Sequence, residues 1–192
     1  MPRSIHLLLL VLWCAMAEVK AVETVYVLAV TRTDVLTLKP TVHEAGARYI
    51  DQVRYDKTTN RDYVLIAADD DALAVLRSTD NVVSVTAMAT KEKLTVFQEQ
   101  DWPAFSSVRV DLALPDNRDS SVYKYASSEL LPKLEEQGFD ARFAASSDGF
   151  VAFDVPDNSR EIVNVIAQEP LVWRVSPYQH QTAKKGAKNC DD

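Results

Sequence analysis

The chain of 192 residues carries 21 lysine and arginine residues against 28 aspartate and glutamate residues, a formal net charge of −7. This balance argues against a nucleic-acid partner, because a protein that neutralises phosphates needs a basic face. Hydrophobic residues make up 47 % of the chain and charged residues 26 %, which excludes a disordered protein and predicts a globular body of one medium or two small domains.

Residues 1–17 have the three regions of a secretory signal peptide. Arg3 gives a positive start, an apolar run covers 5–13, and Ala15-Met16-Ala17 fits the small-x-small cleavage pattern. We expect cleavage after Ala17, with Ala21 as the second option and a buried N-terminal helix as the alternative to a signal. The apolar run is too short to span a membrane. The mature protein is therefore expected to be secreted and extracellular, without a membrane span.

Cysteine usage adds one expectation about the mature chain. Cleavage removes Cys14 and leaves Cys190 alone in a polar tail, so no intramolecular disulfide can form. Cys190 is then either an unused tail cysteine or the link of a disulfide dimer. No Asn-x-Ser/Thr sequon occurs, so N-glycosylation is not expected.

The first predicted unit, at 22–88, shows the order strand, helix, strand, strand, helix, strand. Residues 24–31 are apolar at nearly every position and rich in β-branched side chains, which predicts a central strand. Pro40 and Thr41 open a predicted helix that carries Val42, Ala45, Tyr49 and Ile50, and a short strand is expected at 53–55.

The same unit continues with an apolar strand at 63–68. The acidic run Asp69 to Asp71 then stands where a helix N-terminus favours negative charge, and Leu73 and Leu76 follow on a short helix. A strand at 82–85 closes the unit. Residues 89–106 are mixed and charged and form the expected linker, in which Leu94, Val96 and Phe97 either add a short extended piece or pin it to a domain.

The second predicted unit, at 107–178, repeats this order. Apolar residues from Val108 to Leu114 alternate with polar ones, as in a half-buried strand. Residues 121–137 read as a helix in which Pro132 predicts either a kink or a start near Ser128, and Gly138 suits its end. A strand is expected from alternation at Phe139, Ala141 and Phe143.

The stretch Asp148 to Tyr178 completes this unit as strand, helix and strand. The first strand is expected at 150–155, and the helix starts after the capping residues 157–159 and carries Ile162, Val165 and Ile166. Pro170 stops the helix, and a strand follows at 171–175. Trp173 lies on this strand, where we expect it either in the core or on the bare sheet face as an interface residue.

Two such units predict an α+β protein made of two tandem ferredoxin-like βαββαβ units, each an antiparallel four-stranded sheet with both helices on one face. A polar tail is expected at 179–192. The bare face of the first sheet is predicted to be apolar, so either the second unit or another protein should cover it.

Motifs for catalysis and metal binding are incomplete. His43-Glu44 begins like the zinc-protease helix motif, but Ala47 stands where the second histidine is required. Asp69 to Asp71 could hold a hard cation, yet a helix N-terminus explains them more simply. There is no nucleophile elbow and no phosphate-binding glycine loop. We therefore expect no enzyme activity, no cofactor and no metal; an enzyme that uses scattered carboxylates is the least favoured hypothesis.

The segment Glu169 to Pro177, EPLVWRVSP, has the form p-x-V-x-x-V-x-P, and Asp80 to Val85 matches it less fully. This ending, after a strand and a short helix, resembles the subtilisin propeptide family of the inhibitor I9 type. The resemblance implies a βαββαβ fold whose bare sheet face packs on two helices of a protease. It also implies a C-terminal extension in the active-site cleft, which here corresponds to Tyr178, Gln179, His180 and Gln181. The chain departs from the family in having two tandem units and no catalytic domain after them.

The first functional hypothesis is a secreted, non-catalytic binding protein that acts as a propeptide-like inhibitor or chaperone of a subtilisin-type serine protease. Its expected partner-binding residues are Trp173, Tyr178, Gln179, His180 and Gln181. The alternative is a secreted interaction protein or effector that binds an extracellular or host protein unrelated to proteases.

Overall fold

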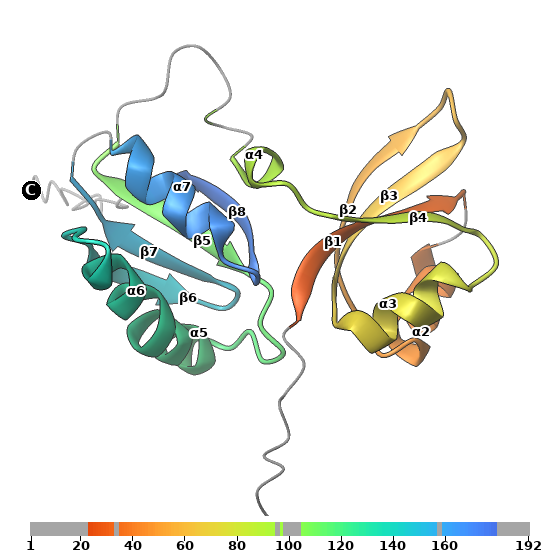
Figure 1. Cartoon of the computed structure of the whole chain (residues 1–192), viewed down its shortest axis with the longest axis horizontal. Helices are drawn as coiled ribbons and strands as arrows, with labels where there is room; N and C mark the ends of the chain where they lie inside the picture. Colours follow the sequence, from red (N-terminus) through yellow and green to blue (C-terminus); the bar gives the residue numbers. More distant parts are fainter. Residues whose placement is uncertain (1–22, 33–34, 95–96, 98–104, 157–158, 180–192) are drawn as a thin grey trace, which may run out of the picture.

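The computed structural model describes residues 23–32, 35–94, 97, 105–156 and 159–179. It contains two four-stranded antiparallel sheets with helices, which confirms the predicted α+β class (Figure 1). The predicted signal peptide, residues 95–96 and 98–104 of the predicted linker, Cys190, His180 and Gln181 lie outside the described residues. No helix in the described ranges is both long enough and apolar enough to cross a membrane.

The first half of the structure forms a sheet with the order β2-β3-β1-β4. Its elements are β1 (Thr24–Thr31), α2 (Val35–Glu44), β2 (Arg48–Asp56), β3 (Arg61–Ala68), α3 (Asp70–Arg77) and β4 (Val82–Ala87). Alternate residues of β1 and β3 face the helices and form a core that includes Leu28, Val64, Ile66, Leu73 and Leu76. The other residues of these two strands, Val25, Leu65 and Ala67, form a separate apolar cluster on the opposite, open face.

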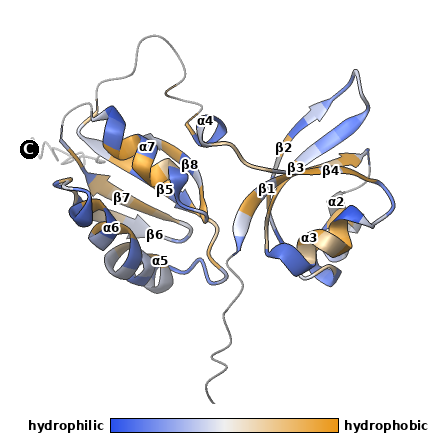
Figure 2. Cartoon of the chain, in the orientation of Figure 1, coloured by the Kyte–Doolittle hydropathy of each residue, from blue (hydrophilic) through white to orange (hydrophobic). Residues whose placement is uncertain are grey.

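The second half forms a sheet with the order β6-β7-β5-β8. Its elements are β5 (Ser107–Leu112), α5 (Asp119–Tyr125), the π-helical turn η2 (Ala126–Leu130), α6 (Leu131–Glu136), β6 (Arg142–Ser147), β7 (Phe150–Asp154), α7 (Arg160–Gln168) and β8 (Val172–Pro177). Figure 2 shows apolar residues along α3 and α7, and in α7 the buried ones include Ile162 and Ile166. They pack with Val110 and Phe153 of the sheet.

Several element boundaries differ from the prediction, most clearly those of α2, β2 and β6. The helix expected from Pro40 to Ile50 instead covers 35–44, contains Pro40, and ends before Gly46, whose φ of +85° suits a helix C-terminus. Tyr49 and Ile50 therefore belong to β2. Strand β6 begins at Arg142 rather than Phe139.

The helical segment around Pro132 is continuous rather than restarted at Ser128. A π-helical turn at 126–130 precedes Pro132, which occupies the first turn of α6. A proline has no amide hydrogen to donate to the preceding turn, and the wider turn accommodates this loss. Gly138 follows with a φ of +82° and ends the segment, as predicted.

Local signals at the start of α3 are confirmed. The Asp69 carboxylate accepts a hydrogen bond of 2.9 Å from the Ala72 amide, and Asp70 and Asp71 occupy the first turn. The acidic run therefore caps a helix. His43 is exposed in the last turn of α2. Within the described part of the chain, no group of three or more His, Cys, Asp or Glu side chains could hold a metal ion.

A short helix in the predicted linker, α4 (Thr90–Lys93), packs against the second half. Leu94 and Phe97 are buried in the core of that half, which confirms their predicted pinning role, whereas Val96 is outside the described residues. The buried Lys93 ammonium donates a hydrogen bond of 2.8 Å to the Glu169 carbonyl. Burial lowers the pKa of Lys93 to about 8, against the opposing effect of the Glu169 charge.

Candidate partner-binding surface

The apolar open face of the first sheet is covered in part by the second half of the chain. Val25, Leu65 and Ala67 pack with Ala113, and Trp173 packs against the same cluster. The Val25 amide also donates a hydrogen bond of 3.1 Å to the Pro170 carbonyl. Of the two covers expected for this face, the structure shows the second half of the same chain.

A β-bulge places Trp173 at this contact. Asp111 of β5 pairs with Arg174 and the next residue, Leu112, pairs with Val172, so Trp173 is an extra residue in β8. A bulge re-aims the side chain that it inserts. The part-buried Trp173 ring packs between the halves, and the Arg174 guanidinium lies 4.7 Å from its centroid. Of the two predicted placements of Trp173, the interface is the one observed, and this interface is internal to the chain.

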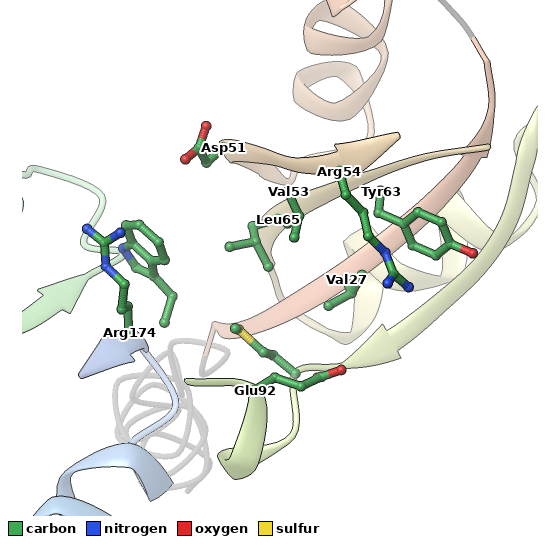
Figure 3. A pocket seen from close by; sticks show the side chains of 10 residues that line it. Val27, Asp51, Val53, Arg54, Tyr63, Leu65, Glu92 and Arg174 are labelled. Carbon is green, nitrogen blue, oxygen red and sulfur yellow. The ribbon is translucent and has the colours of Figure 1, made fainter. Parts of the chain in front are cut away.

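Beside this contact lies an open cleft of about 440 Å³. Figure 3 shows that it is lined by β2 and β3 on one side and by Arg174 on the other, with Glu92 below. Val27, Leu65 and Met88 give it an apolar floor. The Arg54 guanidinium stacks over the Tyr63 ring at 4.5 Å. The cleft therefore combines apolar surface with two arginines, each held flat against an aromatic ring.

The open face of the second sheet is polar, unlike that of the first. Asp111 is buried there, and its carboxylate accepts hydrogen bonds from Arg109 Nε at 2.9 Å and from Arg174 Nε at 2.7 Å. Arg109 Nη2 lies 2.7 Å from the same carboxylate. Charge-assisted hydrogen bonds of this kind hold both guanidinium groups in fixed positions.

Aromatic rings lie beside both guanidinium groups. The Arg109 guanidinium lies 3.9 Å from the centroid of the Phe150 ring, and Arg174 stacks on Trp173. The side chains of Arg109 and Arg174 are 37 % and 46 % exposed, whereas that of Asp111 is 3 % exposed. The solvent side of this Arg109–Asp111–Arg174 network is therefore cationic on an acidic protein.

Tyr178 extends the pairing of β8 beyond Pro177. Its amide donates a hydrogen bond of 2.8 Å to the Ser107 carbonyl, and its ring centroid lies 6.4 Å from that of Phe150. Gln179 follows and is exposed. The structure thus brings Tyr178 close to the Arg109–Asp111–Arg174 network, while Trp173 lies at the opposite end of β8, beside the cleft.

Sequence reasoning identified Trp173 and Tyr178 but missed the ion-pair network between them. Arg109 and Asp111 were visible as the polar positions of an alternating strand. Arg174 is 63 residues away from Asp111, and only the pairing of β8 with β5 brings the two together.

Comparison with known proteins identifies no matching family model, and no curated protein matches the chain. The candidate surface therefore has to be interpreted from its own geometry.

Proposed function

We propose that the chain is a secreted, non-catalytic protein-binding module made of two tandem ferredoxin-like units, and that the second unit inhibits a subtilisin-type serine protease. The sheet orders β2-β3-β1-β4 and β6-β7-β5-β8, each with its helices packed on one face, support the tandem arrangement. The units correspond to 22–88 and 107–178.

One observation carries the assignment of the binding role to the second unit. The open face of the first sheet meets Ala113 and Trp173 of the same chain. The open face of the second sheet instead presents Arg109 and Arg174 to solvent, and its helices α5, α6 and α7 pack on the opposite face (Figure 1). The second unit therefore presents a cationic sheet face to a partner, whereas the open face of the first sheet is covered in part by the second half of the chain.

The mechanism combines this face with the segment after it. Arg109 and Arg174 are positioned to donate hydrogen bonds to carboxylates of a partner, and Phe150 and Tyr178 supply aromatic contact area. Tyr178 continues the direction of β8, and Gln179, which follows it, is exposed at the end of this face. An extended segment there can dock in a protease cleft as an added strand does.

A titration of the chain from Glu18 to Asp192 against a subtilisin-type protease tests the proposal. We expect saturable inhibition of peptide hydrolysis. Truncation after Gln179 should abolish inhibition without unfolding the protein, because the Tyr178 hydrogen bond to Ser107 is retained. Arg174→Gln should weaken inhibition, and Arg77→Gln on α3 is the matched control. Absence of inhibition together with rapid cleavage of the folded body would refute the proposal.

The polar character of the second sheet favours one other function, recognition of a different extracellular protein. Charge-based binding by Arg109 and Arg174 does not require an extended segment in a catalytic cleft. The same truncation separates the two functions, because binding to such a partner should survive removal of residues 180–192 and should be weakened by Arg174→Gln.

A further inference from the structure

The open cleft beside Trp173 has the size of a small-ligand site. Its volume of about 440 Å³ lies within the range of about 300–1,000 Å³ that is typical of small-molecule sites. The first sheet lines one side, and Trp173 and Arg174 of β8 line the other (Figure 3). A molecule bound there contacts both halves of the chain, and its binding does not depend on the protease-binding role proposed above.

Aliphatic side chains form the apolar part of this cleft. Val27, Leu65 and Met88 lie at its floor. Val53 of β2 lines the same cleft and is 51 % exposed. An apolar body that lies on these side chains removes the exposed valine from water, which is favourable in proportion to the buried area. The floor therefore fits an aliphatic chain.

One of the two arginines of the cleft has no counter-charge. The Nε atom of Arg174 donates to the buried Asp111 carboxylate at 2.7 Å. The Arg54 guanidinium lies 4.5 Å from the centroid of the Tyr63 ring and forms no ion pair with any residue that the structure describes. The ring holds the guanidinium flat, and its planar fork of N–H donors matches the two oxygens of a carboxylate.

The two carboxylates that line the cleft do not neutralise Arg54. The Glu92 carboxylate accepts a hydrogen bond of 2.9 Å from the Ala89 amide at the start of α4. Figure 3 shows the Asp51 carboxylate directed away from Val27. Among the described residues, no ion pair joins either carboxylate to Arg54. The N–H donors of Arg54 therefore select an anion as the polar end of a ligand.

We propose that this cleft binds a small amphipathic carboxylate, in which an aliphatic chain ends in a single carboxylate group. The carboxylate accepts hydrogen bonds from the Arg54 guanidinium, and the aliphatic chain lies on Val27, Leu65 and Met88. Val53 and the Trp173 ring cover the chain from opposite sides of the cleft. A neutral chain leaves the Arg54 donors to water, and a cationic head group is repelled by Arg54, so both bind more weakly.

Met88 supplies a signal that is specific to the cleft. The chain contains three methionines, and Met1 and Met16 precede Glu18, so Met88 is the only one in the expected mature chain. The protein from Glu18 to Asp192 is labelled with [13C-methyl]methionine, released from a cleavable tag and titrated with octanoate below its micelle-forming concentration. We expect the Met88 methyl resonance to shift and to reach saturation.

Two further ligands test the selection of charge. Octanol has the same aliphatic chain without the carboxylate, and octyltrimethylammonium has the opposite charge. At equal concentration both should shift the Met88 resonance less than octanoate, because their affinities should be lower by about tenfold or more. A Met88 resonance that does not move, or a shift that does not saturate, overturns the proposal. Equal binding of octanol and octanoate also overturns it, and this comparison needs no variant.

Matched substitutions locate the two ends of the ligand. Arg54→Gln should lower the affinity for octanoate by about five- to tenfold, whereas Arg77→Gln on α3 should leave it unchanged. Val53→Ser should weaken octanoate and octanol alike, whereas Val75→Ser on α3, which is 49 % exposed, should weaken neither. Circular dichroism verifies that each variant is folded. Equal effects of the two arginine substitutions, or of the two valine substitutions, overturn the assignment of this cleft.

Discussion

The Arg48 guanidinium of β2 donates a hydrogen bond of 2.7 Å to the Ala113 carbonyl, which lies just beyond β5 in the other half of the chain. It donates a second one of 2.8 Å to the Leu114 carbonyl and forms an ion pair with Glu23. One side chain thus binds two carbonyl groups of the second half while a carboxylate of the first half balances its charge. This contact borders the apolar cluster that contains Ala113 and fixes the position of that cluster.

Replacing Arg48 with methionine should therefore weaken the contact between the halves. The substitution keeps much of the aliphatic chain but leaves two part-buried carbonyl groups without their donor, and we expect the free energy of unfolding to fall by about 1–3 kcal/mol. Urea denaturation followed by circular dichroism measures the change. Lys57→Met, in the exposed turn between β2 and β3, is the control and should stay within about 0.5 kcal/mol of the wild type. Equal effects of the two substitutions would contradict the role of Arg48.

Elements with strong local signals could be predicted from the sequence. The continuous apolar run at 24–31 forms β1, and Asp69 to Asp71 form the start of α3, as predicted. Both signals are local, because an apolar run that is buried on both faces and a helix cap depend on residues that are neighbours in the sequence. Of β2, only the part at 53–55 could be predicted, because the two register shifts of this strand interrupt the alternation of apolar and polar residues. Gly46 is the signal that ends α2, but Pro40, which favours a helix start, lies inside this helix, and the predicted helix was therefore placed too late in the sequence.

The candidate surface was less accessible to sequence reasoning because it depends on strand register. Whether Trp173 faces the core or the other half is decided by the bulge opposite Asp111 and Leu112, and no local pattern specifies a bulge there. The same register brings Arg174 to Asp111. The alternation of apolar and polar residues indicated the polar positions of β5, but their role in an ion-pair network depends on the pairing of β5 with β8.

Trp173→Ala should destabilise the junction between the halves. The ring packs against the cluster of Val25, Leu65 and Ala67, and its removal leaves apolar surface exposed beside the cleft. Since the ring is only partly buried, we expect a loss of about 2 kcal/mol, below the cost of removing a fully buried tryptophan. Chemical denaturation gives the loss, and small-angle scattering should show a larger radius of gyration. Trp173→Phe keeps an aromatic ring, so its loss in free energy of unfolding should be less than half of the loss for Trp173→Ala. An alanine variant as stable as the wild type would refute the packing role of the ring.

Asp111→Asn should leave two arginines without their shared counter-charge. The buried carboxylate forms an ion pair with both Arg109 and Arg174, so we expect the free energy of unfolding to fall by about 1–3 kcal/mol. The loss should become smaller at high salt, where repulsion between the guanidinium groups is screened. In the Asp111→Asn background, Arg174→Met should cost less than in the wild type, which a double-mutant cycle measures.

A matched control for this network lies at the start of β6 in the second half of the chain. Asp140 and Arg142 have the same spacing of two residues, but they lie 3.3 Å apart and are both largely exposed. Asp140→Asn should therefore change the free energy of unfolding by less than about 0.5 kcal/mol. If the two asparagine variants are equally stable, burial of Asp111 has no energetic role.

Lys93 predicts a specific dependence of stability on pH. Burial lowers the pKa of its ammonium group from 10.5 to about 8 in the folded protein. Between these two pH values the unfolded chain binds a proton that the folded protein has released, so the free energy of unfolding should rise with pH across this window. Below pH 8 both states are protonated, and the full penalty of the buried charge is present. Above 10.5 both are neutral, and the penalty is gone.

Denaturation curves of wild type, Lys93→Met and Lys91→Met across this pH range test that expectation. Lys93→Met removes the buried amine, so the wild type should gain about 2 kcal/mol relative to this variant between pH 7 and pH 10.5. Lys91 lies on the same short helix α4 but is exposed, so Lys91→Met should follow the wild type. Burial raises the pKa of Tyr125 to about 12, above this window, and the tyrosines are the same in all three proteins. Parallel curves for wild type and Lys93→Met would mean that the Lys93 ammonium stays protonated in the folded protein, and that its hydrogen bond to the Glu169 carbonyl offsets the cost of burying the charge.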